Sequence, residues 1–357
     1  NVCKQIIDHL TFEITVKTAK SYKIIIGNGL LNKTTSHIKN ICISKRIAII
    51  GDEKVFKKYA KIIIDNLKTD AYEVCSFAFQ ASEQNKNLHT AEMIYNFLAK
   101  NHFSKDDTII SLGGGIISDM VGFVASTYMR GIRKIYIATT LLSGVDASIG
   151  GKTGLNMKYG KNLIGTFSQP NLVIIDTDTF NTLKLKELQS GFAEIIKCAC
   201  ISDKEFFELL QDAGKYSIKE ILMRTIEIKK NLVELDECEN GNIRIMLNFG
   251  HTIGHALERL TNFSLSHAEA VSIGICLITK FAEAQEICKK GTWKDIVSLC
   301  QKFSLPVDFT YVDEQLIDVM FHDKKANGNF IKCILLKDIG NPVIKKFSKK
   351  EMIDVVS

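Results

Sequence analysis

Two histidines stand four residues apart in the segment LNFGHTIGHALE, residues 247–258, which has helical apolar spacing. On a helix, His251 and His255 would share one face, one turn apart. His267 begins the next helix-like segment, SHAEAV, and Glu194 lies in the segment GFAEIIK. A catalytic zinc site uses three protein ligands and keeps one position open. These four side chains form a candidate metal site, although any single one of the histidines fits an ordinary core position.

Glu194 and Lys197 stand three residues apart in GFAEIIK. On an exposed helix this spacing is typical of a solvated ion pair. The flanking Phe192, Ile195 and Ile196 instead indicate a buried helix face. A buried carboxylate requires a cation or a metal ion beside it, so this pair is compatible with either arrangement.

A glycine-rich stretch, SLGGGIISDMVGF, places Gly113 and Gly115 between a predicted strand and a predicted helix. The pattern is close to the dinucleotide-binding fingerprint, in which glycines let backbone amides approach a pyrophosphate at the helix N-terminus. Ser118 replaces the third glycine, and the stretch lies deep in the chain rather than after a first strand. A tight strand-to-helix turn explains the residues equally well.

The segment DASIGGKTG resembles a phosphate-binding loop, with Lys152 at the centre of its Gly-Lys-Thr. The Walker pattern requires a glycine where Asp146 stands, and this carboxylate would repel a triphosphate. Hydrolysis of nucleoside triphosphates is therefore disfavoured, whereas a lysine among glycines can bind a phosphate monoester as a point charge. Lys161 and Asn162 could add donors, or they could be polar surface residues.

The elements that must hold these residues change in type along the chain. Buried-strand composition occurs in the runs TFEITVKT, YKIIIGNG, RIAIIGDE, DTIISLGGG, KIYIATT and NLVIIDTD. Helical segments separate these runs, which predicts an α/β domain with a largely parallel sheet. Helical spacing dominates later, as in SDKEFFELLQDAG with a predicted capping box from Ser202 to Glu205. We expect an α/β domain at residues 1–180 and a helical domain at residues 181–357, with the site in a cleft between them.

Composition limits the function classes. The 357 residues are 46% apolar and 24% charged, as in an ordinary globular protein. The net charge of +6 fits a small anionic substrate, although solvated lysines explain it as well. The sequence has no dense Lys/Arg block with interleaved aromatics, so it does not indicate a nucleic-acid partner. Ten scattered cysteines without a Cys-x-x-Cys, no signal-peptide core and no apolar run of about 18 residues predict a cytoplasmic, non-membrane protein with reduced thiols.

Segments in the same order along the chain resemble the 3-dehydroquinate synthase family of the shikimate pathway, part of the sugar phosphate cyclase superfamily. They run from about Asp52 to Lys325 and read SEQNKNL, SLGGGIISDMVGF, TYMRGIRKIYIATTLLSGVDASIGGKTGLN, GKNLIGTFSQPNLVIIDT, GFAEIIK, RIMLNFGHTIGHALE, SHAEAV and DKK. The resemblance implies an N-terminal Rossmann-like NAD-binding α/β domain and a mostly α-helical C-terminal metal-binding domain. It also implies NAD and a divalent metal, zinc or cobalt, as cofactors.

The implied enzyme is a phosphorus–oxygen lyase that converts 3-deoxy-D-arabino-heptulosonate 7-phosphate into 3-dehydroquinate and phosphate. NAD oxidises a ring hydroxyl, phosphate leaves by β-elimination, and NADH returns the hydride. The ring then opens, and an intramolecular aldol step closes the carbocycle. The metal acts as a Lewis acid on the reacting hydroxyls.

The resemblance assigns roles at matching positions. The implied metal ligands are Glu194, His251 and His267. The implied catalytic residues are Lys152, Lys197, His255, Asp146 and Asn162, with His255 as a possible proton shuttle. The implied substrate contacts are Arg130 from a second subunit, Lys230, Arg244, Asn248 and Lys324, of which Lys230 and Arg244 match the carboxylate site. The implied NAD contacts are Asp52, Glu83, Lys86, Gly114, Gly115, Asp119, Thr139, Thr140, Asp146, Lys152, Lys161 and Thr182.

Some residues depart from the family pattern, and rival functions remain. Ser118 and Ala268 replace usual glycines, and Ser82 and Asn85 depart from the usual spelling GEQYK.

A sibling cyclase such as 2-deoxy-scyllo-inosose synthase has a substrate without a carboxylate, so it has no use for two cations at the carboxylate site. A metal-dependent polyol dehydrogenase shares the architecture but not the anion clamp. A non-catalytic NAD-binding module is a third reading. The match at Arg130 implies a homodimer, and Asn248 is expected one turn before His251 on the same helix.

Overall fold

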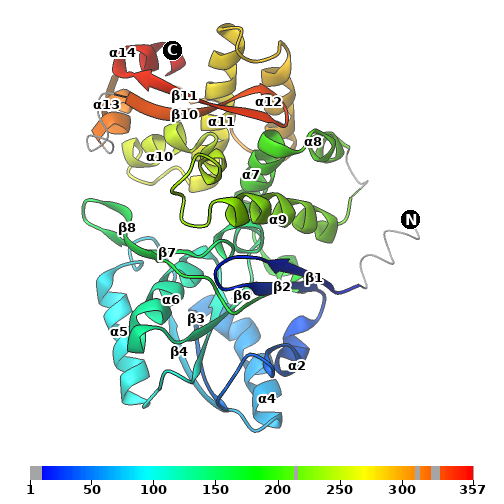
Figure 1. Ribbon diagram of the computed structural model, residues 1–357, viewed down its shortest axis with the longest axis vertical. Coiled ribbons are helices and arrows are strands. Elements are labelled where there is room, and N and C mark those ends of the chain that lie inside the picture. Colours follow the sequence, from blue (N-terminus) through cyan, green and yellow to red (C-terminus); the bar gives the residue numbers. More distant parts are fainter. Residues whose placement is uncertain (1–9, 213–215, 310–313, 323–329, 357) are drawn as a thin grey trace. The chain divides into compact units, whose positions relative to one another are not determined.

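The computed structural model describes residues 10–212, 216–309, 314–322 and 330–356, and the chain divides into two compact units (Figure 1). The first unit contains Asn1–Lys184 and Ser217–Glu234, and the second contains Leu185–Tyr216 and Leu235–Ser357. The predicted boundary at residues 180/181 lies close to the end of the first of these segments. The sequence places Ser217–Glu234 in the helical domain, whereas the structure places this segment in the first unit.

A seven-stranded sheet forms the centre of the first unit, with the order β1-β2-β9-β6-β5-β3-β4. Strand β1 pairs antiparallel with β2, and the other neighbouring pairs are parallel, as the buried β-branched runs predict. The strands are β1 (Phe12–Val16), β2 (Tyr22–Gly27), β3 (Arg46–Asp52), β4 (Glu73–Phe79), β5 (Thr108–Gly113), β6 (Arg133–Ala138) and β9 (Leu172–Asp176). The prediction misses β4, an edge strand whose residues are mostly half-buried and form no continuous apolar run.

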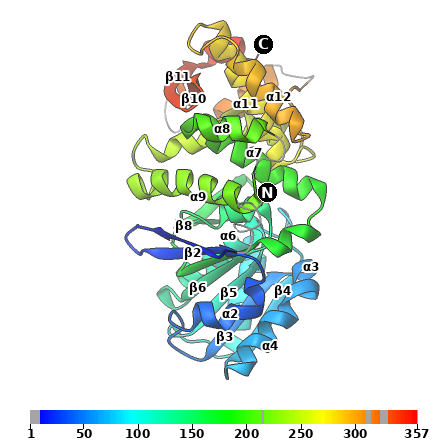
Figure 2. The ribbon, with the colours of Figure 1, turned by 90° about the vertical axis from the view of Figure 1, so that its right-hand side faces the viewer.

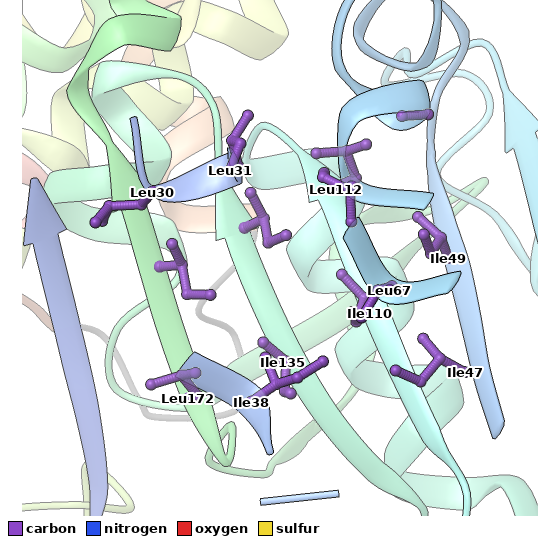
Figure 3. Packing of buried hydrophobic residues seen from close by; sticks show 14 of the residues in the cluster. Leu30, Leu31, Ile38, Ile47, Ile49, Leu67, Ile110, Leu112, Ile135 and Leu172 are labelled. Atoms are coloured by element: carbon purple, nitrogen blue, oxygen red, sulfur yellow. The ribbon is translucent and has the colours of Figure 1, made fainter. Parts of the chain in front are cut away.

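Helices cover both faces of this sheet. Alternate side chains of a strand point to opposite faces, and apolar side chains on both faces must be buried. On one face, Ile47 and Ile49 of β3 pack in a buried cluster with side chains of α2 (Thr34–Ile38) and α4 (Lys61–Thr69) (Figure 3). On the other face, Ala48 and Ile50 pack with α5 (Leu88–Lys100) and α6 (Gly115–Thr127). Each fully buried Ile or Leu contributes about 1.5–3 kcal/mol, so this packing fixes the positions of the strand ends.

The first unit also contains a hairpin and one long helix. The hairpin pairs β7 (Lys152–Met157) with β8 (Gly160–Phe167), and the helix is α9 (Ile218–Leu235). Short helical turns span Leu30–Lys33, Glu53–Val55, Phe56–Ala60, Tyr128–Arg130, Ser143–Ala147 and Thr177–Thr182. Lys152 begins a strand, whereas the lysine of a Walker loop leads into a helix. The structure therefore agrees that this segment is not a triphosphate-binding loop.

The second unit is mostly helical, as the sequence predicts. Its helices are α7 (Leu185–Ser202), α8 (Lys204–Gln211), α10 (His251–Leu260), α11 (His267–Ala284), α12 (Thr292–Lys302), α13 (Glu314–His322) and α14 (Lys349–Val356), with a 3-10 helix at Arg244–Asn248. Helix α11 packs against α7 and α12 (Figure 2) and against α10. An antiparallel hairpin of β10 (Phe330–Asp338) and β11 (Asn341–Ser348) is not predicted.

The predicted capping box at Ser202 is wrong. Helix α7 continues through Ser202, and Asp203 is the N-cap of α8, where its side chain accepts the backbone N–H of Phe206 at 2.9 Å. No disulfide joins the cysteines that the structure describes, which are all of them but Cys3. Among the described helices, none has the length and apolar character that crossing a membrane requires.

Candidate functional site

Three predicted metal-binding side chains meet in the second unit. Glu194 lies in α7, while His251 and His267 are the first residues of α10 and α11. The Oε1 atom of Glu194 lies 3.5 Å from Nε2 of His251 and 3.4 Å from Nε2 of His267. The three residues come from three helices, so the packing of α11 against α7 and α10 assembles the set.

These distances fit a shared metal ion. Two ligand atoms about 2.0–2.1 Å from a zinc ion in tetrahedral geometry lie about 3.4 Å apart. Both carboxylate oxygens of Glu194 are buried, and neither accepts a hydrogen bond from the described residues, although Lys197 forms an ion pair with Oε2. Lys197 supplies positive charge at Oε2, and a divalent metal would supply it at Oε1, the oxygen that faces both histidines.

The electrostatics also suit a cation. Burial lowers the pKa of His251 to about 3 against the opposing effect of Glu194, so the imidazole is neutral and its Nε2 can bind a metal. Burial also lowers the pKa of His267, but the carboxylates of Glu194 and Glu258 outweigh burial and raise this pKa to about 10. Burial raises the pKa of Glu194, but Lys197 and the two histidines hold it well below its usual range. A metal ion would neutralise the negative charge around His267.

His255 stands beside this set. Its ring centroid lies 5.3 Å from that of His251 and 5.7 Å from that of His267, and ligand atoms of the three histidines lie within 4.8 Å of one another. Geometry alone therefore leaves four possible ligands, as the sequence does. The side chain of His255 is exposed whereas that of Glu194 is buried, and exposure suits a residue that meets a substrate.

The segment LNFGHTIGHALE is not one helix. The 3-10 helix ends before Gly250, whose φ of 76° is left-handed, and α10 begins at His251. A Cβ at position 250 would lie 2.4 Å from a side-chain atom of Ile275, so this close approach requires glycine. Asn248 therefore does not lie one turn before His251 on a shared helix, which corrects that expectation. Its amide instead donates to Glu239 at 3.2 Å.

Arg244 is held by the loop that precedes it. Its side chain is buried, at 1% exposure, and one guanidinium N–H donates to the carbonyl of Glu237. The carboxylate of Asp236 accepts the backbone N–H of Gly241 at 3.1 Å and that of Arg244 at 3.2 Å. Asp236 is not among the predicted site residues, although an Asp that opens a loop between helices is typical of a side chain that binds backbone amides.

The predicted cofactor-binding residues gather at the carboxyl ends of the parallel strands. These positions are Asp52 at the end of β3, Gly114 and Gly115 after β5, and Thr139 and Thr140 after β6. Thr182 ends the helical turn after β9, and its hydroxyl lies 2.8 Å from that of Tyr59. In open α/β sheets, ligands bind outside the carboxyl ends where the strand order reverses. Here the order reverses between β3 and β5, beside Asp52 and the glycine-rich turn.

The glycine-rich turn has the features of a dinucleotide site. Gly115 is the first residue of α6, and no side chain caps this helix N-terminus, so backbone N–H groups can bind an anion. A Cβ at position 115 would lie 2.9 Å from Cβ of Ala147. The hydroxyl of Thr139 is buried without a hydrogen-bond partner among the described residues. The hydroxyl of Ser118 donates to the carbonyl of Gly115 at 3.0 Å, so the α6 turn accommodates this departure from the family pattern.

Lys86 joins two predicted residues. Its ammonium donates to Oδ2 of Asp119 at 2.5 Å and to Oδ1 of Asn162 at 2.6 Å. Burial raises the pKa of Asp119, and Lys86 opposes this effect. A pocket of about 320 Å³ within the first unit is lined by Asp119, Lys152 and Asn162 together with other hairpin residues. The pocket thus combines a lysine and an amide that can donate to an anionic ligand.

The two carboxylates expected to bind ribose already have partners. Glu83 accepts a hydrogen bond from the amide of Asn156 at 2.7 Å and lies 3.7 Å from Nζ of Lys161. Asp52 caps the turn that follows β3, and its Oδ2 accepts the backbone N–H of Ala81 at 3.0 Å. A carboxylate offers about four acceptor positions, so Asp52 keeps capacity for a ribose hydroxyl.

Asp146 contacts a lysine that the sequence analysis does not select. Lys229 of α9, whose side chain is 7% exposed, donates to the carbonyl oxygen and to Oδ1 of Asp146, both at 2.5 Å. The predicted Lys230 instead pairs with Glu227 at 2.8 Å on the same helix. The buried face of α9 includes Leu222, Ile226, Lys229 and Val233. This helical phase is the signal that distinguishes Lys229 from Lys230 in the sequence.

Two further predicted substrate contacts differ in what the structure shows. Arg130 is exposed, and both it and Met129 have left-handed backbone, with φ of 62° and 52°. Such conformations cost about 1–3 kcal/mol for each non-glycine residue and are concentrated at functional sites. Lys324, like Lys325, lies outside the described residues.

Two family models match the chain. The one described as 3-dehydroquinate synthase N-terminal matches residues 76–190, and the one described as 3-dehydroquinate synthase C-terminal matches residues 191–326. The 3-dehydroquinate synthase of Lactococcus lactis subsp. cremoris is 42% identical over 340 residues, which cover 93% of this chain and 95% of the relative. The enzyme of the same name from Streptococcus thermophilus is 40% identical over 351 residues, which cover 96% and 98%.

Solved structures agree on the fold. A 2-deoxy-scyllo-inosose synthase, solved with carbaglucose-6-phosphate, NAD+ and Co2+, has a TM-score of 0.86 at 23% identity, covering 97% of this chain and 99% of the other. The 2-epi-5-epi-valiolone synthase of Streptomyces hygroscopicus subsp. jinggangensis, solved with NAD+ and Zn2+, has a TM-score of 0.86 at 24% identity, covering 96% and 98%. These likenesses confirm the predicted fold class. The sequence matches confirm the predicted family: this chain belongs to the 3-dehydroquinate synthase family.

Proposed function

We propose that this protein is an NAD- and metal-dependent phosphorus–oxygen lyase that converts 3-deoxy-D-arabino-heptulosonate 7-phosphate into 3-dehydroquinate and phosphate. The observation that carries the proposal is the position of Oε1 of Glu194, 3.5 and 3.4 Å from Nε2 of His251 and His267. This donor set fits a divalent metal. It stands in a chain whose first unit presents an uncapped helix N-terminus and two carboxylates for a dinucleotide.

When bound, NAD would take up and return a hydride at a ring hydroxyl, and zinc or cobalt would act as a Lewis acid on the substrate hydroxyls. The N-terminus of α6, with Gly114 and Gly115, would hold the pyrophosphate. Asp52 and Glu83 would accept hydrogen bonds from ribose hydroxyls and repel a ribose phosphate, which favours NAD over NADP. Further contacts in the proposed NAD site come from Lys86, Asp119, Thr139, Thr140, Asp146, Lys152, Lys161 and Thr182.

Glu194, His251 and His267 would hold the metal, and Lys197 would stay beside the carboxylate with which it pairs. His255 is exposed and has two ring nitrogens that can give or take a proton near neutral pH. We assign His255 to the movement of protons to and from the substrate rather than to the metal. The exposure of its side chain supports this division.

The anionic ends of the substrate require separate cations. Lys152 and Asn162 line the pocket of the first unit and would bind the phosphate there. The proposed phosphate contacts of Asn248 and Lys324 rest on the resemblance to the family alone. For the carboxylate we propose Arg244 with Lys229 in place of Lys230. The support for this exchange is that Lys229 is buried against Asp146, whereas Lys230 pairs with a partly exposed glutamate.

Two rival activities are less well supported. A sibling cyclase whose substrate lacks a carboxylate would make no use of Arg244 and Lys229 as a site for that group. A polyol dehydrogenase would have no need of a phosphate-binding lysine at Lys152. Sustained accumulation of NADH with a polyol would support the dehydrogenase instead.

We also propose that the protein is a homodimer and that it is cytoplasmic. The exposure and left-handed backbone of Arg130 support a role in a second copy of the chain, and hence a homodimer. The scattered cysteines of the sequence, none of them in a Cys-x-x-Cys, are compatible with the proposed cytoplasmic location.

Metal removal tests the proposed function. Dialysis against a strong chelator should abolish release of phosphate from the heptulosonate phosphate, and zinc or cobalt should restore it, because Glu194 and the two histidines would lose their shared ion. Full activity in excess chelator would overturn the metal assignment. Circular dichroism of the chelated protein serves as the control for folding.

A further inference from the structure

Glu258 is a buried carboxylate that the proposed reaction does not use. It lies on α10, seven residues after His251, and only 3% of its surface is exposed. Residues seven apart share a helix face, so Glu258 and His251 lie on the same side of α10, about two turns apart. A buried carboxylate needs a hydrogen-bonding or charged partner, and the structure supplies one from the next helix.

That partner is His267, the first residue of α11. The Oε2 atom of Glu258 lies 3.2 Å from Nδ1 of His267, while Nε2 of the same ring lies 3.4 Å from Oε1 of Glu194. The imidazole thus spans two carboxylates, one at each nitrogen. A metal ion can bind Nε2 only when that nitrogen carries no proton, so the neutral ring would keep its proton on Nδ1 and donate it to Glu258.

The close packing of two helices brings Glu258 to this position. A Cβ at Gly274 of α11 would lie 2.1 Å from the carbonyl oxygen of Gly250, which a real side chain cannot do. The backbones of the α10 and α11 segments therefore touch where these glycines stand. Nearer to Glu258, a Cβ at Gly254 of α10 would lie 3.0 Å from the carbonyl oxygen of Ala270, so the close contact between the two helices continues toward the start of α11.

The second histidine of the set is held differently. Nδ1 of His251 lies 3.1 Å from the backbone carbonyl of Phe249, which is a neutral acceptor. Of these two rings, only that of His267 has a carboxylate among the described contacts of its Nδ1 atom, the nitrogen that points away from Glu194. A carboxylate bound to that nitrogen orients a ligating ring and makes Nε2 a stronger donor to the metal.

We propose that Glu258 is a positioning residue for the metal site: it fixes the tautomer and orientation of His267 and strengthens Nε2 as a ligand. This inference rests on the metal site of the proposed function. Loss of an outer-sphere partner of this kind typically weakens metal binding by about 10- to 100-fold. Glu258→Gln keeps an acceptor but removes the charge, so it should fall at the lower end of this range. Glu258→Ala should fall at the upper end.

The test measures metal binding without turnover. The metal-free wild-type protein, Glu258→Gln, Glu258→Ala and the control Glu286→Gln are titrated with cobalt(II) against a chromophoric chelator. The control removes one carboxylate charge at an exposed position of the same unit. We expect weaker binding and an altered cobalt visible spectrum in both Glu258 variants, and wild-type behaviour in Glu286→Gln. Thermal unfolding of each metal-free protein is the check on folding, and Glu258→Gln decides the question if Glu258→Ala does not fold.

The outcomes distinguish a failure of the proposed role of Glu258 from a failure of the proposed metal site. Tight cobalt binding by the wild type with unchanged affinity and spectrum in Glu258→Gln would overturn the role of Glu258 alone. Failure of the wild type to bind cobalt would overturn both this role and the proposed metal site. Weaker binding in the Glu258 variants, with the control unaffected, supports the role.

Discussion

Adjacent lysines on α9 allow a matched test of the proposed anion site. Lys229 donates two hydrogen bonds to Asp146, each of 2.5 Å, from a side chain that is 7% exposed. These bonds hold Lys229 in place in the free protein, so their energy is not itself lost from the transition state. The proposed contact with the substrate carboxylate is one further charged hydrogen bond, which contributes about 1.5–3 kcal/mol. We therefore expect Lys229→Met to lose about 1.5–3 kcal/mol of transition-state stabilisation, or about 10- to 150-fold in kcat/KM.

Lys230→Met is the matched control. Lys230 pairs with Glu227, whose side chain is 46% exposed, and such a surface pair contributes about 0–1 kcal/mol. This substitution should therefore change kcat/KM by at most about fivefold. The assay is steady-state phosphate release at saturating NAD, with NAD affinity and thermal unfolding measured for both variants. A large loss in Lys230→Met with near-normal activity in Lys229→Met would refute this reasoning and restore the assignment made from sequence.

Three further predictions follow from single side chains. Burial lowers the pKa of Lys134 to about 7, far below its value near 10.5 in the unfolded chain. Below pH 7 the folded state is therefore destabilised by a buried charge, and this penalty disappears as the pH rises toward 10.5. Lys134→Met should raise Tm more at about pH 6 than at about pH 10, and equal shifts would contradict this. Gly115→Ala places a Cβ 2.9 Å from Ala147, so calorimetry should show NAD binding weakened by about tenfold or more, and an unchanged Kd would argue against the pyrophosphate site. Asp236→Ala removes the acceptor for two backbone N–H groups in the loop before Arg244, so KM for the substrate should rise more than kcat falls, and a change in kcat alone would count against this positioning.

The sequence was sufficient for the parts of the fold that local pattern determines. Continuous β-branched runs identified the strands at the centre of the sheet, because strands buried on both faces need apolar residues throughout. The edge strand β4 and the hairpin β7–β8 lack such runs, so local pattern could not find them. Strand β10 has a buried apolar run at residues 333–336, but its partner β11 does not, and the hairpin was missed. The place of α9 in the first unit depends on which surface its apolar face meets, and helical periodicity does not encode the partner.

The site shows the same division. The residue types predicted four candidate metal ligands, and the resemblance to the family selected Glu194, His251 and His267 among them. The structure brings the ligand atoms of these three residues together. The break at Gly250 was missed because apolar spacing continues across it, although the left-handed turn ends one helix and starts another. Lys229 was missed although the helical phase of α9 places it on the buried face, because the resemblance was followed at Lys230 instead. Glu258 was missed because its role depends on a contact with His267 that only the packing of α10 against α11 reveals.

The most direct test of the central claim is the stoichiometry of phosphate and NADH in one reaction. Purified, metal-loaded protein is mixed with 3-deoxy-D-arabino-heptulosonate 7-phosphate, with and without NAD, while phosphate and the absorbance of NADH are followed together. The proposed function predicts many turnovers of phosphate release that require NAD, with no net accumulation of NADH. Phosphate release that is independent of NAD, or NADH that accumulates in proportion to substrate consumed, would contradict it.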